Sequence, residues 1–307
     1  NKMDNTQTNH TLFITKVGTP LDKSCARLLI ESLRSFGGVM QNCPFWIFEI
    51  NPEKTACQDM VDLNVDVLPL NTPAPLCDFL FGEKVYACAQ AELLAPPDIH
   101  SLVWIDPICL IVQPPLLYRL TAYYDAAFRP VHIRNVGSPA NKPPDAFWQK
   151  IYDVVGVNDM PILVESFVDG QRLRAYFNSH VFAVNPAKGW MQRWLTCVGT
   201  LISDQQFQSA ICQNEAHRVF LFQAILSAIV AGSIDDKRLL ILPPVYNYPY
   251  NLHQSIPAER RVKSLNDLTS LVYENRSLNP REIGDIEIHD PLYKWLIQRE
   301  NALPRLK

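Results

Sequence analysis

The sequence carries no large excess of charge of either sign. Lys and Arg number 28 against 31 Asp and Glu, which gives a formal net charge of −3. A nucleic-acid groove or a polybasic membrane patch requires clustered positive charge. The densest basic group, Arg260, Arg261 and Lys263, is expected to be a solvated loop. The charge balance therefore argues against nucleic acid as a partner.

Long apolar runs are also missing. The longest candidate, "VFLFQAILSAIVAG" at residues 219–232, falls short of the roughly 20 residues that span a bilayer, so we expect a buried helix and no transmembrane segment. Residues 1–10, "NKMDNTQTNH", lack the hydrophobic region of a signal peptide and are expected to be a disordered lead-in. These features predict a cytoplasmic location.

The eight cysteines contain no Cys-x-x-Cys pair, and several stand inside apolar segments. This spacing argues against a zinc site and against a disulfide framework. Free, buried thiols in a reducing compartment are the expected state.

What the sequence does contain is an alternation of strand-like and helix-like segments. The predicted strands of the first half are residues 11–15, 44–50, 65–70 and 101–105, and the predicted helices between them are residues 21–36 and 82–95. In the second half we predict strands at 125–131, 174–185 and 238–244, and helices at 188–202 and 221–230. This rhythm predicts an α/β fold with a single mixed, mostly parallel sheet and helices on both faces. Residues 11–255 are expected to form one domain and 256–307 a C-terminal extension that packs on it.

One carboxylate stands at the end of a buried strand. In "SLVWIDPICLI" the strand 101–105 runs directly into Asp106. A buried carboxylate is costly unless it is paired or hydrogen-bonded, and ligands of such sheets bind beyond the carboxyl ends of the strands. Asp106 is therefore either a ligand-binding residue or an acid that caps the turn at Pro107.

The order of these segments resembles that of the nucleotide-sugar glycosyltransferases of the A-type fold. "VWIDPICLI" is similar to the family's Asp-x-Asp strand end, with Ile108 in place of the second Asp. "YFNSHVFAVNP" is similar to the strand that lines the sugar and acceptor site. "FQAILS" keeps the glutamine of a helix that often begins with an acid and Gln, with Phe222 at the acid's position. "LPPVYNYPYNLH" and "IEIHDP" are similar to later family segments.

The resemblance implies a role for each matching residue. The implied nucleotide-binding residues are Thr15, Lys16, Val17, Lys84 and Asp106; the substrate-binding residues are Ser179, His180 and Asn247; the catalytic residues are Gln223 and Asn178; and the metal ligands are Asp106 and His289. Mn²⁺ or Mg²⁺ would bridge the two phosphates as a Lewis acid. Because isoleucine cannot ligate a metal, Ile108 weakens this expectation.

Each of these residues also has a structural alternative. Lys84 can be a solvated helix residue, and Asn178 and Ser179 can satisfy a bulge in their strand. His180 is expected to narrow the sugar pocket, and Gln223 is either a sugar contact or a satisfied buried amide. Asn247 can belong to an ordered connection, while His289 with Asp290 can cap the last helix.

Two functions follow from this pattern. The first is transfer of a sugar from a nucleotide-diphosphate sugar to an unknown acceptor. The second is a glycosyltransferase-like binding or structural protein without turnover, which Ile108 and Phe222 both favour. A nucleotidyltransferase is set aside because no glycine-rich loop with Lys or Arg follows the first strand.

Overall fold

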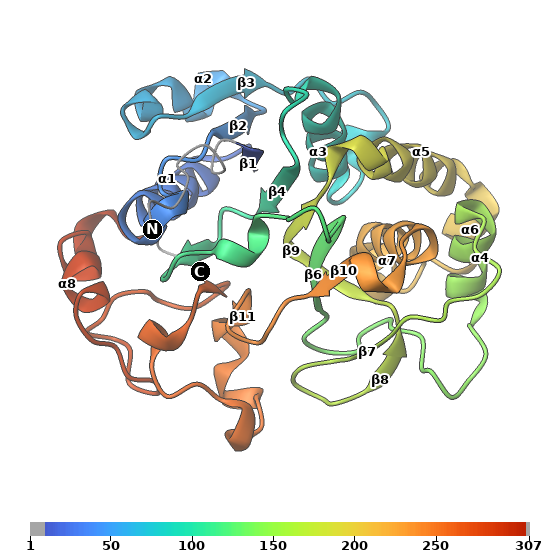
Figure 1. The fold of residues 1–307 in the computed structure, drawn as a ribbon. Coiled ribbons are helices and arrows are strands. Elements are labelled where there is room, and N and C mark those ends of the chain that lie inside the picture. Colours follow the sequence, from blue (N-terminus) through green and yellow to red (C-terminus); the bar gives the residue numbers. More distant parts are fainter. Residues whose placement is uncertain (1–9, 305–307) are drawn as a thin grey trace. The chain divides into compact units, whose positions relative to one another are not determined.

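The computed structural model describes residues 10–304, and Figure 1 shows its elements. The strands are β1 (Thr11–Val17), β2 (Phe45–Glu49), β3 (Asp66–Pro69), β4 (Ser101–Ile105), β5 (Cys109–Ile111), β6 (Ala126–Pro130), β7 (Leu163–Glu165), β8 (Arg172–Arg174), β9 (Phe177–Val184), β10 (Leu239–Ile241), β11 (Tyr248–Pro249) and β12 (Ser270–Val272). The α-helices are α1 (Pro20–Phe36), α2 (Pro52–Thr55), α3 (Gly82–Leu94), α4 (Ala146–Val155), α5 (Trp190–Ser203), α6 (Gln205–Ala210), α7 (Glu215–Ser233) and α8 (Leu292–Ile297). The expected lead-in lies outside the described residues except for His10.

The main sheet has seven strands in the order β10-β6-β9-β4-β1-β2-β3. Strands β1, β2 and β3 pair in parallel, as do β10 and β6, whereas β6 and β9 are antiparallel. The predicted mixed, mostly parallel α/β fold is therefore confirmed. A second sheet has the order β11-β12-β5, and β7 with β8 forms a separate hairpin.

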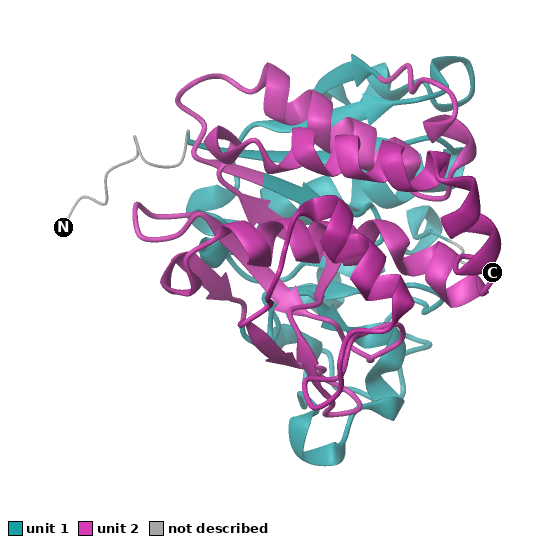
Figure 2. Ribbon diagram, turned by 90° about the vertical axis from the view of Figure 1, so that its right-hand side faces the viewer, with its two compact units in different colours: residues 1–69, 103–119, 243–307 teal, residues 70–102, 120–242 magenta. Residues whose placement is uncertain are grey.

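The chain divides into two compact units, which Figure 2 colours separately. Unit 1 comprises residues 1–69, 103–119 and 243–307, and unit 2 comprises residues 70–102 and 120–242. Within unit 1, the C-terminal residues pack on α1, because Trp295 donates to Ser35 at 2.9 Å and meets the edge of Phe36 at 5.3 Å. The expected domain boundary at residue 255 stays a prediction.

Local signals explain the start of unit 1. Strand β1 is buried almost throughout, as expected for a strand inside a parallel sheet. Helix α1 begins with a capping box, in which Thr19 accepts from the Asp22 amide and Asp22 accepts from the Thr19 amide. The helix ends at Phe36, followed by Gly37, where a Cβ would lie 2.3 Å from the Leu33 carbonyl oxygen.

The segment after β4 carries the chain from the main sheet into the small one. The amide of Cys109 donates to the carbonyl oxygen of Asp106 at 3.1 Å, which closes a tight turn. Strand β5 follows at once and pairs antiparallel with β12. Asp106 thus stands on a connection that is held at both ends.

Helix α7 is the central helix of unit 2. It has 19 residues, and its 18-residue window of mean hydropathy 1.4 is long and apolar enough to cross a membrane, so the expectation that this stretch is too short is wrong. The helix begins at Glu215, before the apolar run, which is why its length was underestimated. Every residue from 221 to 231 is buried, and α7 packs against α4, α5 and β9. The prediction of a buried helix is confirmed.

Two further details differ from the sequence-based expectation. The predicted strand 174–185 is divided, because Arg174 belongs to β8 and β9 begins at Phe177. The Val131 amide donates to the Tyr176 carbonyl at 3.1 Å, beside an irregularity in the β6–β9 register. Among the cysteines, all eight are free and seven are buried as expected, whereas Cys77 is exposed.

We predict that Asp125 makes a pH-dependent contribution to stability. Its buried carboxylate accepts from Arg238 at 2.5 and 2.8 Å and lies 2.8 Å from the Lys188 ammonium, and these bonds lower its pKa to about 2. A lowered folded-state pKa stabilises above the unfolded pKa of about 4, and this stabilisation is lost as the pH falls toward 2. We expect Asp125→Asn to cost about 2 kcal/mol of unfolding free energy at pH 7 and about half as much at pH 3.

Urea unfolding at the two pH values measures this difference. Asp236→Asn is the matched control, because Asp236 is exposed and lies two residues before Arg238 in the chain. An equal cost of Asp125→Asn at pH 7 and pH 3 would contradict the assigned role.

Candidate functional site

Three of the predicted residues meet in unit 2 through hydrogen bonds. Ser179 on β9 donates from its amide and its hydroxyl to Oε1 of Gln223 on α7, at 3.0 and 2.9 Å. Lys84 on α3 donates from Nζ to the Ser179 carbonyl oxygen at 2.5 Å. All three are buried. The solvated alternative for Lys84 is therefore wrong, and the Gln223 carbonyl is a satisfied buried group.

The neighbouring residues of β9 bond to each other. Oδ1 of Asn178 accepts from the His180 amide at 2.9 Å and lies 3.0 Å from Nδ1 of the His180 ring. Asn178 is buried, whereas His180 is half-buried. The Asn178 side chain thus orients the His180 ring. The catalytic roles of Asn178 and Gln223 and the substrate contacts of Ser179 and His180 stay predictions.

Phe222, at the position of the expected acid, belongs to an aromatic cluster. Its ring stacks on Phe81 with centroids 4.3 Å apart and on Trp194 with centroids 6.1 Å apart. The Trp194 indole donates to the Phe222 carbonyl at 2.8 Å, and the Lys84 ammonium lies 5.5 Å from the Phe222 ring centroid. Cation and ring attract each other at such a distance. An aromatic surface that faces a cation thus stands where the resemblance predicts a carboxylate.

The expected nucleotide loop of unit 1 follows β1. Thr15 and Val17 are buried, and Lys16 is half-buried. The next two amides, those of Gly18 and Thr19, both donate to Oδ2 of Asp22, at 3.0 and 3.1 Å. The main-chain donors that precede α1 are therefore already occupied by a carboxylate, and the nucleotide contacts of residues 15–17 stay predictions.

Asp106 is half-buried at the end of β4. Its Oδ1 accepts from the Trp104 indole nitrogen at 2.8 Å, and Trp104 itself is buried. The turn beyond it is closed by the Asp106 main chain, and the Ile108 carbonyl accepts from the Tyr273 amide at 3.1 Å. The carboxylate is thus positioned by an indole and is not enclosed in the core.

The other two predicted residues of unit 1 have structural partners. Asn247 is fully buried in the left-handed conformation, with φ +49°, and its amide donates to Ser270 Oγ at 2.8 Å. His289 is exposed, and its Nε2 lies 3.1 Å from a carboxylate oxygen of Glu287. Their roles in substrate and metal binding stay predictions.

The residues present supply only part of a ligand set for the expected Mn²⁺ or Mg²⁺. Between His10 and Pro304, no group of three or more His, Cys, Asp or Glu side chains is arranged to hold a metal ion. Such ions prefer about six oxygen ligands, and Ile108 supplies none where the family motif has its second Asp.

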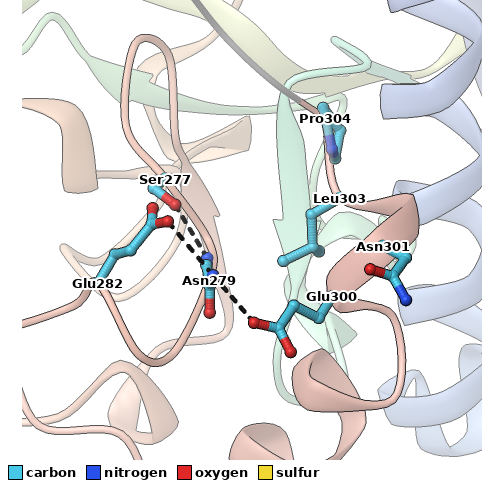
Figure 3. A pocket seen from close by; sticks show the side chains of 7 residues that line it. All are labelled: Ser277, Asn279, Glu282, Glu300, Asn301, Leu303 and Pro304. Carbon is cyan, nitrogen blue, oxygen red and sulfur yellow. Dashed lines mark hydrogen bonds between the residues drawn. The ribbon is translucent and has the colours of Figure 1, made fainter.

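A pocket of unit 1 near the end of the chain contains carboxylates but none of the predicted residues. Its volume is about 430 Å³, and it is lined by Ser277, Asn279, Glu282, Glu300, Asn301, Leu303 and Pro304. The side-chain nitrogen Nδ2 of Asn279 lies between two carboxylates, 3.3 Å from that of Glu282 and 3.4 Å from that of Glu300 (Figure 3). These two acids are therefore bridged by an amide.

Sequence reasoning missed a buried basic group at the end of β6. Arg129 donates to the Leu242 carbonyl at 3.1 Å and lies over the Phe167 ring. Neither ring nitrogen of His132 has a hydrogen-bond partner among the described residues. Burial, followed by the charges of Arg129 and His180, keeps the pKa of His132 well below its ordinary value. The sequence contained a signal for this group, because Arg129 is a charged residue inside an otherwise apolar strand. Asp106, which directly follows an apolar strand, gave a similar signal.

Comparisons with known proteins agree with this fold. The galactosyltransferase LgtC, solved with donor and acceptor sugar analogs, is 10% identical over 97% of this chain and 98% of that chain, with a TM-score of 0.53. The bifunctional glycosyltransferase WbbM is 13% identical over 95% of this chain and 52% of that chain, with a TM-score of 0.55. This chain therefore spans about half the length of WbbM. Identities this low indicate a shared fold only.

At the level of sequence, no curated protein gave a significant match. The family model described as the Rhodobacterales glycosyltransferase domain matches residues 20–233, which is more than half of the chain. The matched range includes helix α1, Asp106 and the polar residues of β9 and α7. The chain belongs to this glycosyltransferase domain family.

Proposed function

We propose that the protein transfers a sugar from a nucleotide-diphosphate sugar to an acceptor. The match of a glycosyltransferase family model over residues 20–233 carries this proposal. LgtC, which shares the fold, was solved with donor and acceptor sugar analogs. Asp106 directly follows the carboxyl end of β4, a strand of the main sheet, and ligands of such sheets bind at that end of the strands.

The transfer breaks the bond between the anomeric carbon of the sugar and a phosphate oxygen, and it forms a bond to the acceptor oxygen. The departing nucleotide diphosphate takes the bonding electrons and gains negative charge. We assign Lys84 to offset this charge, because one of its three N–H donors is held by Ser179 at 2.5 Å and orients the ammonium. No step is routed through a metal, because the described residues contain no group of three or more candidate ligands.

The acceptor hydroxyl must lose a proton. A side-chain base is the usual recipient, but Phe222 stands at the position of the expected acid and faces Phe81 and Trp194. We therefore assign the proton to an oxygen of the departing phosphate. The acceptor oxygen then attacks the anomeric carbon on the same face from which the phosphate departs. The configuration of the anomeric carbon is therefore retained.

A second candidate function is binding of a sugar nucleotide without turnover. Two observations favour it, the apolar Ile108 at the position of the second Asp and the stacked Phe222 at the position of the acid. Both functions require nucleotide binding, so they differ in turnover alone.

Titration with UDP, GDP and ADP, each with and without Mn²⁺, tests the shared requirement by thermal shift. A ligand at 100 times its dissociation constant raises the unfolding free energy by about 2.7 kcal/mol. UMP, GMP and AMP are the control ligands, because they lack the second phosphate. Release of free sugar from the corresponding sugar nucleotides then measures turnover.

We expect one diphosphate to stabilise the protein more than its monophosphate, and the matching sugar nucleotide to be turned over. Stabilisation without turnover in the presence of acceptor sugars would favour the binding protein. A protein that none of the three diphosphates stabilises would contradict both functions.

A further inference from the structure

The aromatic cluster of unit 2 reaches the surface at one end. Trp194 and Phe222 are buried, whereas Phe81 keeps 36% of its surface exposed although one face of its ring lies on Phe222. The rings of Phe81 and Phe222 are inclined by 29°. The stack thus begins in the core and ends in a phenyl ring that is open to a ligand.

The backbone of Phe81 holds this ring in an uncommon conformation. Its φ of +66° is left-handed, which is a genuine outlier for a bulky side chain. Such conformations cost about 1–3 kcal/mol and cluster at ligand-binding sites. The structure therefore keeps Phe81 in place at the expense of backbone energy.

The turn around Phe81 is closed rather than loose. The Gly82 amide donates to the Phe79 carbonyl at 2.9 Å, and the Val85 amide donates to the Phe81 carbonyl at 3.2 Å. A Cβ on Gly82 would lie 2.0 Å from the Leu76 carbonyl oxygen, so only glycine fits there. Phe81 is accordingly presented by a built turn at the start of α3.

A hydrogen-bonded chain of polar groups begins beside the inner ring of the stack. The Lys84 ammonium lies 5.5 Å from the Phe222 ring centroid and is bonded to Ser179, which in turn is bonded to Gln223. Ligand sites commonly combine an apolar or aromatic surface with a few fixed polar groups. A sugar ring has the matching chemistry, because C–H groups cover its faces and hydroxyls surround its edge.

We propose that Phe81, supported by Phe222, is the surface on which the transferred sugar of the donor stacks. Lys84 lies one helical turn from Phe81 and is the residue assigned to the phosphates, so a sugar attached to those phosphates falls beside the stack. This inference rests on the proposed function. It makes Phe81 a specificity-determining residue that contacts the sugar and not the nucleotide.

The test compares the affinities of the wild-type protein and its Phe81→Ala variant for nucleotide and for sugar nucleotide. Calorimetric titration uses UDP, GDP and ADP, and then UDP-glucose, UDP-galactose, UDP-xylose, UDP-N-acetylglucosamine, GDP-mannose and ADP-glucose. We expect Phe81→Ala to lower the affinity for the sugar nucleotide that binds best by about tenfold. The affinity for the nucleotide diphosphate without a sugar should change by less than about twofold, because this ligand does not contact the Phe81 ring.

Two further variants isolate the ring. Phe81→Trp keeps an aromatic surface and should retain most of the affinity for the sugar nucleotide. Leu80→Ala is the matched control, because Leu80 is 50% exposed and adjacent in the same turn. Melting temperatures of all variants check that the turn stays folded.

The outcomes separate the two proposals. If no nucleotide binds the wild type, the proposed function fails, and the donor-sugar platform fails with it. If nucleotide binds but Phe81→Ala leaves the sugar-nucleotide affinity unchanged, only the platform is overturned. An equal loss in Leu80→Ala would also overturn it, because the effect would then belong to a general apolar surface.

Discussion

Replacing Asp106, the proposed nucleotide-binding carboxylate, by alanine is expected to lower kcat/KM for sugar transfer by about 100-fold, a loss typical of one preorganised polar group. The Trp104 indole holds the carboxylate at the end of β4 at 2.8 Å. Its removal therefore deletes a positioned group as well as a charge. Kinetics with the sugar nucleotide that the binding experiments select measure the effect.

Two variants accompany this measurement. Asp106→Asn keeps an oxygen that accepts from Trp104 but removes the charge, so the difference between Asn and Ala separates charge from position. Asp66→Asn is the matched control, because Asp66 is an exposed acid of β3 in the same unit. If Asp106→Ala behaves like this control in both turnover and nucleotide affinity, Asp106 only shapes the turn at Pro107.

The second large effect concerns stability. We expect Trp194→Ala to lower the free energy of unfolding by about 3–5 kcal/mol, as is typical when a fully buried aromatic side chain is truncated. Trp194 is fully buried, stacks on Phe222 and meets the edge of Phe182 with centroids 6.2 Å apart. Its indole also donates to the Phe222 carbonyl, which would lose this partner.

Urea unfolding followed by circular dichroism measures this change. Trp194→Phe keeps much of the ring volume and loses only the indole hydrogen bond to the Phe222 carbonyl, so we expect a smaller cost of about 1 kcal/mol. A cost of Trp194→Ala that does not exceed that of Trp194→Phe would show that packing around Phe222 is loose.

A candidate site residue could be predicted from the sequence where a charged side chain directly follows a buried strand. Asp106 was found because a carboxylate directly after a buried strand is costly, and the structure gives it an indole partner. The buried pair Arg129 and His132 carried a similar signal, but no local pattern indicated which groups would surround them. Phe222 at the position of the expected acid was visible in the sequence. Its stacking on Phe81, which is 141 residues earlier in the chain, was not.

The elements whose causes are local can be predicted from the amino-acid sequence. The helix α1 begins at a capping box that spans four residues, and the parallel strands appear as apolar runs, so both were predicted close to their observed bounds. The hydrogen bonds of Ser179 to Gln223 and Lys84 form only when the chain folds, because they join positions 44 and 95 residues apart. The division of the predicted strand 174–185 into β8 and β9 likewise depends on tertiary contacts. Contacts of such sequence separation depend on how helices pack on strands, and the periodicity of a single segment contains no information about its partner.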